Sequence, residues 1–318
     1  MRATTGTADR RAGFEKIVLV TRKTRLAELV ERFNTQAQAK FYIEHAGGNF
    51  CEYQLEDEAY RRSAEIVRRL LDVGLKFQEI DRGLLPTFTF LPQDLVITLG
   101  QDGLVANTAK YVGKQPLIAV NPDPEEFDGI LLPFLPHQTG AAVAHVLEGK
   151  CRIRSVTLAE ARMNDGQRLL AFNDLFLGAQ THVSARYRIR WAKSEEPQSS
   201  SGVLVSTGAG STGWVSSAFN MASGVAALAG GHTVKPIRLD WEDRHLLFVV
   251  REPFVSRHSQ ANIVAGLIEQ QQALELESLM PSGGVIFSDG IEADFLQFNS
   301  GSSVIVKAAA ETAQLVVG

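Results

Sequence analysis

The chain has 318 residues, of which 45% are hydrophobic and 21% are charged, and its formal net charge is −4. This composition is ordinary for a folded protein that is large enough for two domains, and the charge gives no general attraction to nucleic acid or anionic lipid. The two cysteines, Cys51 and Cys151, form no Cys-x-x-Cys pair, which argues against a disulfide framework and a structural zinc site.

Residues 1–14 contain no apolar run of the kind found in a secretory signal, and we interpret them as a disordered lead-in. No stretch of the sequence approaches the roughly 18 to 20 apolar residues that a membrane helix needs. We therefore expect a cytoplasmic protein with neither nucleic-acid nor membrane partners.

Residues 15–150 alternate between short apolar runs and helical patterns, with short connections between them. This repetition predicts a Rossmann-like α/β domain with a parallel sheet and helices on both faces. Strands are expected at 16–21, 76–80, 94–100 and 116–121, and helices at 26–43, 56–74 and 104–112.

Residues 151–318 differ in pattern and predict a β-rich domain, either a sandwich or a layered sheet. The segment 182–193 alternates with period two, which is typical of a half-exposed antiparallel strand, and 194–202 is interpreted as a turn-rich break. One small-residue helix is expected at 214–228. Further strands are expected at 203–207, 245–250, 261–268, 273–279, 284–289 and 302–308.

The segment VSTGAGSTGW (205–214) contains a Gly-x-Gly-x-x-Gly pattern from Gly208 to Gly213. A Rossmann loop needs an acidic residue about 20 positions later, but 197–239 contains no Asp or Glu, and the motif lies in the β-rich half. A P-loop is excluded because no Gly-Lys-Ser/Thr follows. Two interpretations remain: a glycine-rich turn, or a loop whose hydroxyls and backbone N–H groups bind a ribose or phosphate.

Three other loops carry polar residues next to apolar runs. Asp102 lies between glycines after the expected strand 94–100, where it could accept a proton, help to hold Mg²⁺, or form a plain Asp-Gly turn. The pair Asn173-Asp174 interrupts an apolar run and could bind ligand hydroxyls or cap local backbone. Asp289-Gly290 is interpreted as a hairpin turn. His137 and His145 have no third ligand beside them, so no metal-ligating residues are assigned.

The order of these loops resembles the NAD kinase family, whose members carry Gly-Gly-Asp-Gly-Thr, then Asn-Glu or Asn-Asp, then Ser-Thr-Pro-Thr-Gly-Ser-Thr-Ala-Tyr. Here the corresponding segments are 100–104, 173–174 and 206–214, followed by a late Asp-Gly. The segments 120–134, 175–191, 199–211 and 248–254 look most like the mitochondrial-type branch. The likeness extends from about Lys16 to the C-terminus.

The resemblance implies a nucleotide-binding domain (15–150) and a β-rich NAD-binding domain (151–318), with the site in the cleft between them and an extreme C-terminus able to pack back on the first domain. The implied reaction transfers the γ-phosphoryl group of ATP, or of polyphosphate, to the adenosine ribose 2′-hydroxyl of NAD, with Mg²⁺ or another divalent cation. A homodimer or homotetramer is expected.

By the same resemblance, Asp102 matches the catalytic Asp, and Asn173 and Asp174 match the pair that binds the ribose hydroxyls. Trp214 replaces the usual Tyr as a stacking surface for the adenosine. The full set of predicted binding residues is Gly100, Gln101, Gly103, Asn121, Asn173, Asp174, Ser211, Thr212, Gly213, Trp214 and Ser217.

Besides Trp214, three positions depart from the family pattern: Gln101 replaces its second glycine, Leu104 replaces its Thr, and Ser201 stands where many bacterial members have Asp. Gln101 could crowd ATP or donate an amide hydrogen to it, and Leu104 removes a hydroxyl. Three functions therefore stay open: an active NAD kinase, a non-catalytic NAD- or NADP-binding protein, and a kinase for another hydroxyl acceptor such as a sugar or lipid. The sequence leaves open the phosphoryl donor and the choice between NAD and NADH.

Overall fold

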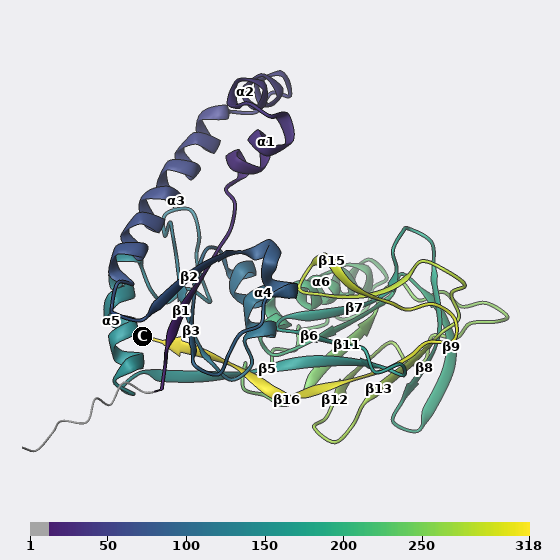
Figure 1. Cartoon of the computed structure of the whole chain (residues 1–318). Coiled ribbons are helices and arrows are strands. Elements are labelled where there is room, and N and C mark those ends of the chain that lie inside the picture. Colours follow the sequence, from purple (N-terminus) through teal and green to yellow (C-terminus); the bar gives the residue numbers. More distant parts are fainter. Residues whose placement is uncertain (1–12) are drawn as a thin grey trace, which may run out of the picture. The chain divides into compact units, whose positions relative to one another are not determined.

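The computed structural model describes residues 13–318, so nearly all of the predicted lead-in (1–14) lies outside the described residues. The chain divides into two compact units (Figure 1): unit 1 comprises the residues up to 154 together with 314–318, and unit 2 comprises 155–313. Among the described residues, no helix is both long enough and apolar enough to cross a membrane.

Unit 1 is built on a parallel sheet whose strand order is β2-β1-β3-β4-β16. Every residue of β3 is buried, as expected where both faces of a parallel sheet are covered. The last strand joins this sheet when Gln314 and Leu315 pair with β4, so the C-terminal end of the chain packs in unit 1. The strands are β1 (Lys16–Thr21), β2 (Lys76–Asp81), β3 (Asp94–Leu99), β4 (Pro116–Val120) and β16 (Ser303–Val317).

The helices of unit 1 cover both faces of this sheet. Apolar residues of α3 and α5 form one cluster with β1, β3 and β4, while α4 packs against β3 and β4 from the opposite face (Figure 1). The helices are α1 (Arg25–Phe33), α2 (Gln36–His45), α3 (Phe50–Leu70), α4 (Asp102–Val112) and α5 (Thr139–Leu147), with 3₁₀ turns η1 (Arg82–Thr87) and η2 (Pro136–Gln138).

The single helix expected over 26–43 is two helices in the structure. Asn34 ends α1 with a left-handed φ of 65°, a conformation that Asn tolerates better than most residues. Thr35 then begins α2, because its side-chain oxygen accepts a hydrogen bond from the Gln38 N–H at 3.2 Å. The helical spacing of apolar residues continues through Asn34 and Thr35, so the sequence pattern alone did not indicate a break there.

Unit 2 consists of two layers of antiparallel strands. One is a six-stranded sheet of order β12-β11-β10-β7-β14-β15, and the other contains β16-β13-β8-β9 with β5 and β6. The strands are β5 (Arg152–Met163), β6 (Arg168–Ala171), β7 (Asp174–Ala179), β8 (Ala185–Trp191), β9 (Ser194–Ser200), β10 (Val203–Ser206), β11 (Leu246–Val250), β12 (Ala265–Ile268), β13 (Leu274–Ser278), β14 (Gly284–Ser288) and β15 (Ile291–Gln297). The 3₁₀ turn η3 (Ala209–Thr212) and helix α6 (Trp214–Leu228) follow β10.

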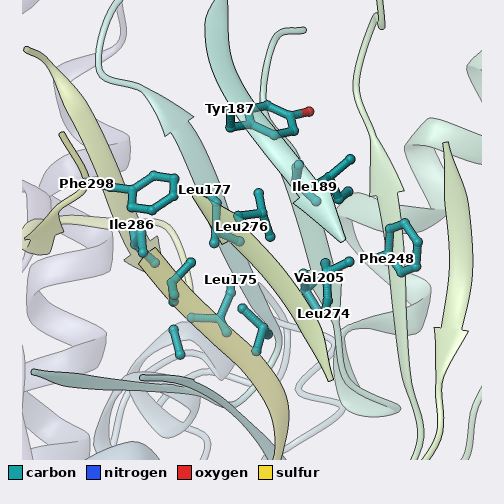
Figure 2. Packing of buried hydrophobic residues seen from close by; sticks show 14 of the residues in the cluster. Leu175, Leu177, Tyr187, Ile189, Val205, Phe248, Leu274, Leu276, Ile286 and Phe298 are labelled. Carbon is teal, nitrogen blue, oxygen red and sulfur yellow. The ribbon is translucent and has the colours of Figure 1, made fainter. Parts of the chain in front are cut away.

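The core of unit 2 lies between these layers. Figure 2 shows Leu175 and Leu177 of β7 among side chains from both sheets, including Tyr187 and Phe248. Because side chains alternate along a strand, Asp174 and Phe176 point away from this core. The mixed α/β fold with a parallel domain and a separate β-rich domain, predicted from the sequence, is therefore confirmed.

The turn-rich break expected over 194–202 is wrong, since Ser194–Ser200 forms strand β9, paired with β8. Pro197 is compatible with a strand here because β9 is at the sheet edge. Glu196 is buried and accepts backbone hydrogen bonds from Asn262 and Ile263, both at 2.9 Å. These partners are far away in the sequence, and they convert a polar segment into an ordered strand.

Candidate functional site

In unit 1, the loop after β3 places Asp102 at the carboxyl edge of the parallel sheet. The Gly100 N–H donates to the carbonyl of Val120 at 3.2 Å, which ties the loop to β4. Gln101 is exposed and extended, and Asp102 is the first residue of α4. The free N–H groups and the dipole of a helix N-terminus favour negative charge at this place.

The Asp102 carboxylate is held by a loop that Asn121 organises. Its Oδ1 accepts a hydrogen bond from the Leu131 N–H at 2.8 Å. Asn121 is buried; its Nδ2 donates to the Phe127 carbonyl at 3.0 Å, and its Oδ1 accepts from the Asp123 N–H at 3.0 Å. Asn121 thus acts on Asp102 through the loop backbone, and its direct contact with a ligand stays a prediction.

The residues that flank Asp102 have different surroundings. Leu104 is buried, and a Cβ added at Gly100 would lie only 2.7 Å from its Cδ2, so this leucine belongs to the packing around the loop. A Cβ added at Gly103 would meet no atom within 4 Å, and Gln101 is exposed. Gln101 and Gly103 therefore border open space where a phosphate could approach.

A charged cluster beside this loop was missed by the sequence reasoning. The Tyr60 hydroxyl donates to the Leu99 carbonyl and accepts from the Arg22 N–H, both at 3.0 Å. The Arg22 guanidinium bonds Glu56 at 2.9 Å; burial opposes the charge of Glu56, but hydrogen bonds from Arg25 and Arg22 lower the pKa of this carboxyl. The sequence did contain a signal for this cluster, since Arg22 directly follows the expected strand 16–21. The carboxyl ends of neighbouring parallel strands lie at one edge of the sheet, so Arg22 was to be expected near Asp102.

In unit 2, Asp174 is the first residue of β7 and Asn173 directly precedes it, on a backbone held by a carboxylate that is distant in the sequence. Asp289 accepts hydrogen bonds from the N–H groups of Phe172, Asn173 and Asp174 at 3.0, 2.7 and 3.3 Å. The half-buried side-chain amide of Asn173 makes no hydrogen bond within residues 13–318. The backbone of the pair is therefore fixed, while this amide is available to a ligand.

Asp174 is a buried carboxylate with an unsatisfied oxygen. The residue is 9% exposed, and its Oδ1 has no hydrogen-bond partner among the described residues. Burial raises the pKa of this carboxyl to about 7, the hydroxyl of Ser206 opposes the shift, and the negative charge of Asp289 adds to it. A buried acceptor without a donor is costly, and a ligand hydroxyl would satisfy it.

The hydroxyls of the loop after β10 serve mainly to hold the loop itself. Ser206, Thr207 and Ser211 are buried. The Thr207 hydroxyl donates to the Phe172 carbonyl, and the Ser211 hydroxyl donates to the Gly208 carbonyl at 2.7 Å. The predicted ligand contact of Ser211 is untested, and its hydroxyl is already engaged in the fold.

Aromatic rings line a pocket of about 350 Å³ on the face of β7 that carries Asp174. Phe176 stacks on Trp214 with ring centroids 5.7 Å apart and on Phe287 at 4.9 Å, and the Arg251 guanidinium lies 5.3 Å from the centre of the Trp214 ring. Such a pocket suits a flat ring. Its lining residues are Phe176, Ala179, Gln180, Thr181, His182, Val183, Ser201, Trp214, Arg251, Val285, Phe287, Glu292 and Phe295.

The remaining predicted residues lie at the start of α6. Thr212 and Gly213 are exposed, and Trp214 is 36% exposed. Ser217 lines a second, largely apolar pocket of about 570 Å³ that also includes Trp214 and Arg251. The structure thus brings the predicted residues of unit 2 to one region around Trp214 and β7.

No family model matches this sequence, and no curated protein does. Solved structures do match. Yeast NADH kinase in complex with NADH aligns over 95% of this chain and 83% of its own, with a TM-score of 0.57 and 16% identity. An NAD kinase from Archaeoglobus fulgidus in complex with ATP aligns over 94% and 92%, with a TM-score of 0.53 and 15% identity. The chain has the two-domain fold of NAD kinases. At this identity the likeness establishes the fold and leaves the substrate to be argued from the site.

Proposed function

We propose that this chain is an NAD kinase-like phosphotransferase that moves the γ-phosphoryl group of ATP, or of polyphosphate, to the adenosine ribose 2′-hydroxyl of NAD and so forms NADP. The observation that carries this proposal is the unsatisfied Oδ1 of the buried Asp174, on the same strand face as a pocket lined with aromatic rings. A carboxylate acceptor beside a stacking surface matches a ribose attached to a flat base. The proposal includes that, within the NAD kinase family, the chain is most similar to the mitochondrial-type branch.

In unit 2 the proposed task is to bind the dinucleotide. Deprotonated Asp174 accepts hydrogen bonds from ribose hydroxyls, and the Asn173 amide adds a donor and an acceptor. Trp214 is held in orientation by its contacts with Phe176 and Arg251, so little side-chain entropy is lost when a base packs against it.

In unit 1 the proposed task is the chemistry. Asp102 takes the proton of the 2′-hydroxyl while the hydroxyl oxygen bonds to the γ-phosphorus and the bond from that phosphorus to the leaving ADP oxygen breaks. The hydrogen bond from Leu131 fixes the Asp102 carboxylate for this role. The N-terminus of α4 provides N–H groups for phosphate oxygens.

The residues present fit a divalent cation that arrives with the nucleotide. Residues 13–318 contain no group of three or more His, Cys, Asp or Glu side chains that could hold a metal ion. Mg²⁺ commonly binds through one or two carboxylates and the phosphates of its substrate, and Asp102 would supply such a carboxylate at the proposed phosphate site. When bound, the cation would neutralise charge on the phosphates.

The experiment that tests the proposal measures NADP formation from NAD, ATP and Mg²⁺ by the wild type, Asp102→Asn and Asp72→Asn. Asp72 is an exposed aspartate of the same unit and is the matched control. Removing a general base costs about 10²- to 10⁴-fold in rate, so Asp102→Asn should lose at least a hundredfold and Asp72→Asn should match the wild type. Equal rates for all three proteins would refute the assigned role of Asp102.

One observation favours a second candidate, a protein that binds NAD or NADP without catalysis. Gln101 is exposed next to Asp102, and it carries a side chain at the position where the NAD kinase pattern has glycine. If the wild type binds NAD but forms no NADP with ATP or polyphosphate, Gln101→Gly distinguishes a crowded donor site, which would become active, from a true binding protein. A panel of sugar and lipid acceptors tests the third possibility, a kinase for another hydroxyl.

A further inference from the structure

The turn between β14 and β15 is a two-residue hairpin turn whose first residue is an aspartate. Asp289 has φ 54° and Gly290 has φ 70°, both in the left-handed region that such turns require. Its backbone is also tied to β7, since the Asp289 N–H donates to the Asp174 carbonyl at 2.9 Å. The hairpin predicted from the sequence is present, and the side chain of Asp289 makes further contacts.

Both oxygens of the Asp289 carboxylate face the start of β7. Oδ2 accepts from the Phe172 N–H at 3.0 Å, and Oδ1 accepts from the N–H groups of Asn173 and Asp174 at 2.7 and 3.3 Å. Three successive N–H groups that converge on one anion form a strong, charge-assisted arrangement. A turn alone does not need these bonds, because its geometry is set by Asp289 and Gly290.

The same backbone connects to the loop after β10. The Asn173 carbonyl accepts from the Thr207 N–H at 2.9 Å, and the Phe172 carbonyl accepts from the Thr207 hydroxyl. A Cβ added at Gly210 would lie 2.2 Å from the Asn173 carbonyl oxygen, so the two loops touch without space for a side chain. Asp289 therefore holds residues 172–174, which carry one part of the proposed NAD site and anchor the loop after β10 that forms the other part.

We propose that Asp289 is a positioning residue of this site: its carboxylate holds the backbone of 172–174 so that the side chains of Asn173 and Asp174 are presented to the ribose. This inference rests on the proposed function for the identity of the ligand. The charge of Asp289 has a second effect, because it adds to the burial that raises the pKa of Asp174. Among the described residues, Asp289 on the β14–β15 turn is the charged group that acts on Asp174, and β10 contributes the uncharged hydroxyl of Ser206.

Two variants separate the hydrogen bonds from the charge. Asp289→Ala removes all three acceptors, and the amides of 172–174 should then exchange with solvent at least about tenfold faster in the ligand-free protein. Asp289→Asn keeps one acceptor oxygen and removes the charge, so the carboxyl of Asp174, followed by ¹³C NMR, should titrate about one pH unit lower. NAD affinity should fall at least about tenfold in Asp289→Ala.

The control is Asp165→Asn, an exposed aspartate in a turn of the same unit, which should change none of these values. Unchanged amide exchange in Asp289→Ala would overturn the positioning role, and an unchanged titration of Asp174 in Asp289→Asn would overturn the charge effect. If Asp289→Ala does not fold, amide exchange in Asp289→Asn decides: its amide replaces one of the two acceptor oxygens by a donor, so exchange at 172–174 should be faster, and exchange at the wild-type rate would overturn the positioning role. Exchange and titration need no ligand, so a wild type that fails to bind NAD would contradict the proposed function while these two measurements still test Asp289.

Discussion

The free energy of unfolding of Asp174→Asn, relative to that of the wild type, should increase as the pH rises, although the substitution removes a residue of the proposed site. The Asp174 carboxyl has a pKa of about 7 in the folded chain, raised by burial from about 3.8. The unfolded chain therefore loses this proton near pH 4, and the folded chain keeps it until near pH 7. Because the folded state binds more protons in this window, the contribution of Asp174 to the free energy of unfolding falls as the pH rises from 4 to 7 and is constant above.

The size of this change in the free energy of unfolding follows from the part of the pH window in which unfolding is measured. Between about pH 5 and pH 7 the proton difference acts over two pH units, and each unit corresponds to about 1.36 kcal/mol, which gives about 2 to 3 kcal/mol. An asparagine has nearly the same shape and does not ionise, so it lacks this loss. The stability of Asp174→Asn relative to the wild type should therefore increase by about 2 to 3 kcal/mol between about pH 5 and about pH 8.

The assay is urea unfolding of the wild type, Asp174→Asn and Asp165→Asn at these two pH values. Asp165 is exposed, and a hydrogen bond from the Gln167 backbone lowers the pKa of its carboxyl, so it is ionised throughout the range and its variant should show no such increase. A constant difference between Asp174→Asn and the wild type at both pH values would refute the reasoning, because the carboxyl would then titrate as it does in the unfolded chain.

Three further substitutions give outcomes of different kinds. Leu104→Thr should lower the free energy of unfolding by about 1 to 3 kcal/mol in urea, because the side chain packs over Gly100 and the new hydroxyl would be buried; an unchanged unfolding midpoint would contradict this packing. Gly210→Ala should cost about 1 to 3 kcal/mol by collision with the adjacent backbone carbonyl, whereas Gly224→Ala, in open space on α6, should add about 0.5 to 1 kcal/mol; equal thermal shifts for the two alanines would be evidence against the close approach. Trp214→Ala should weaken NAD binding about tenfold by calorimetry, and unaltered affinity would show that the ring does not contact the ligand.

The sequence could predict those features that depend on neighbouring residues. A continuous apolar run identified β3, and the glycines and Asp102 that follow it placed a polar loop at its carboxyl end. The division into a parallel and a β-rich part followed from the change in periodicity.

The features that the sequence missed depend on contacts between distant residues. Strand β9 needs Glu196 to meet Asn262, which lies 66 positions later, and nothing local in a polar segment announces this partner. The hydrogen bonds of Asp289 reach backbone more than 100 positions earlier. The Asp-Gly pair predicted the turn, but which groups its side chain would meet depends on the fold.

The most direct test of the central claim identifies the product of the reaction. ³¹P NMR would follow NAD, ATP and Mg²⁺ incubated with the wild type and with Asp102→Asn. The account predicts a new phosphomonoester at the adenosine ribose 2′-oxygen with the wild type, together with ADP, and at least about a hundredfold slower formation with the variant. Absence of that phosphomonoester with either ATP or polyphosphate as donor, or its formation at the same rate by the variant, would contradict the account.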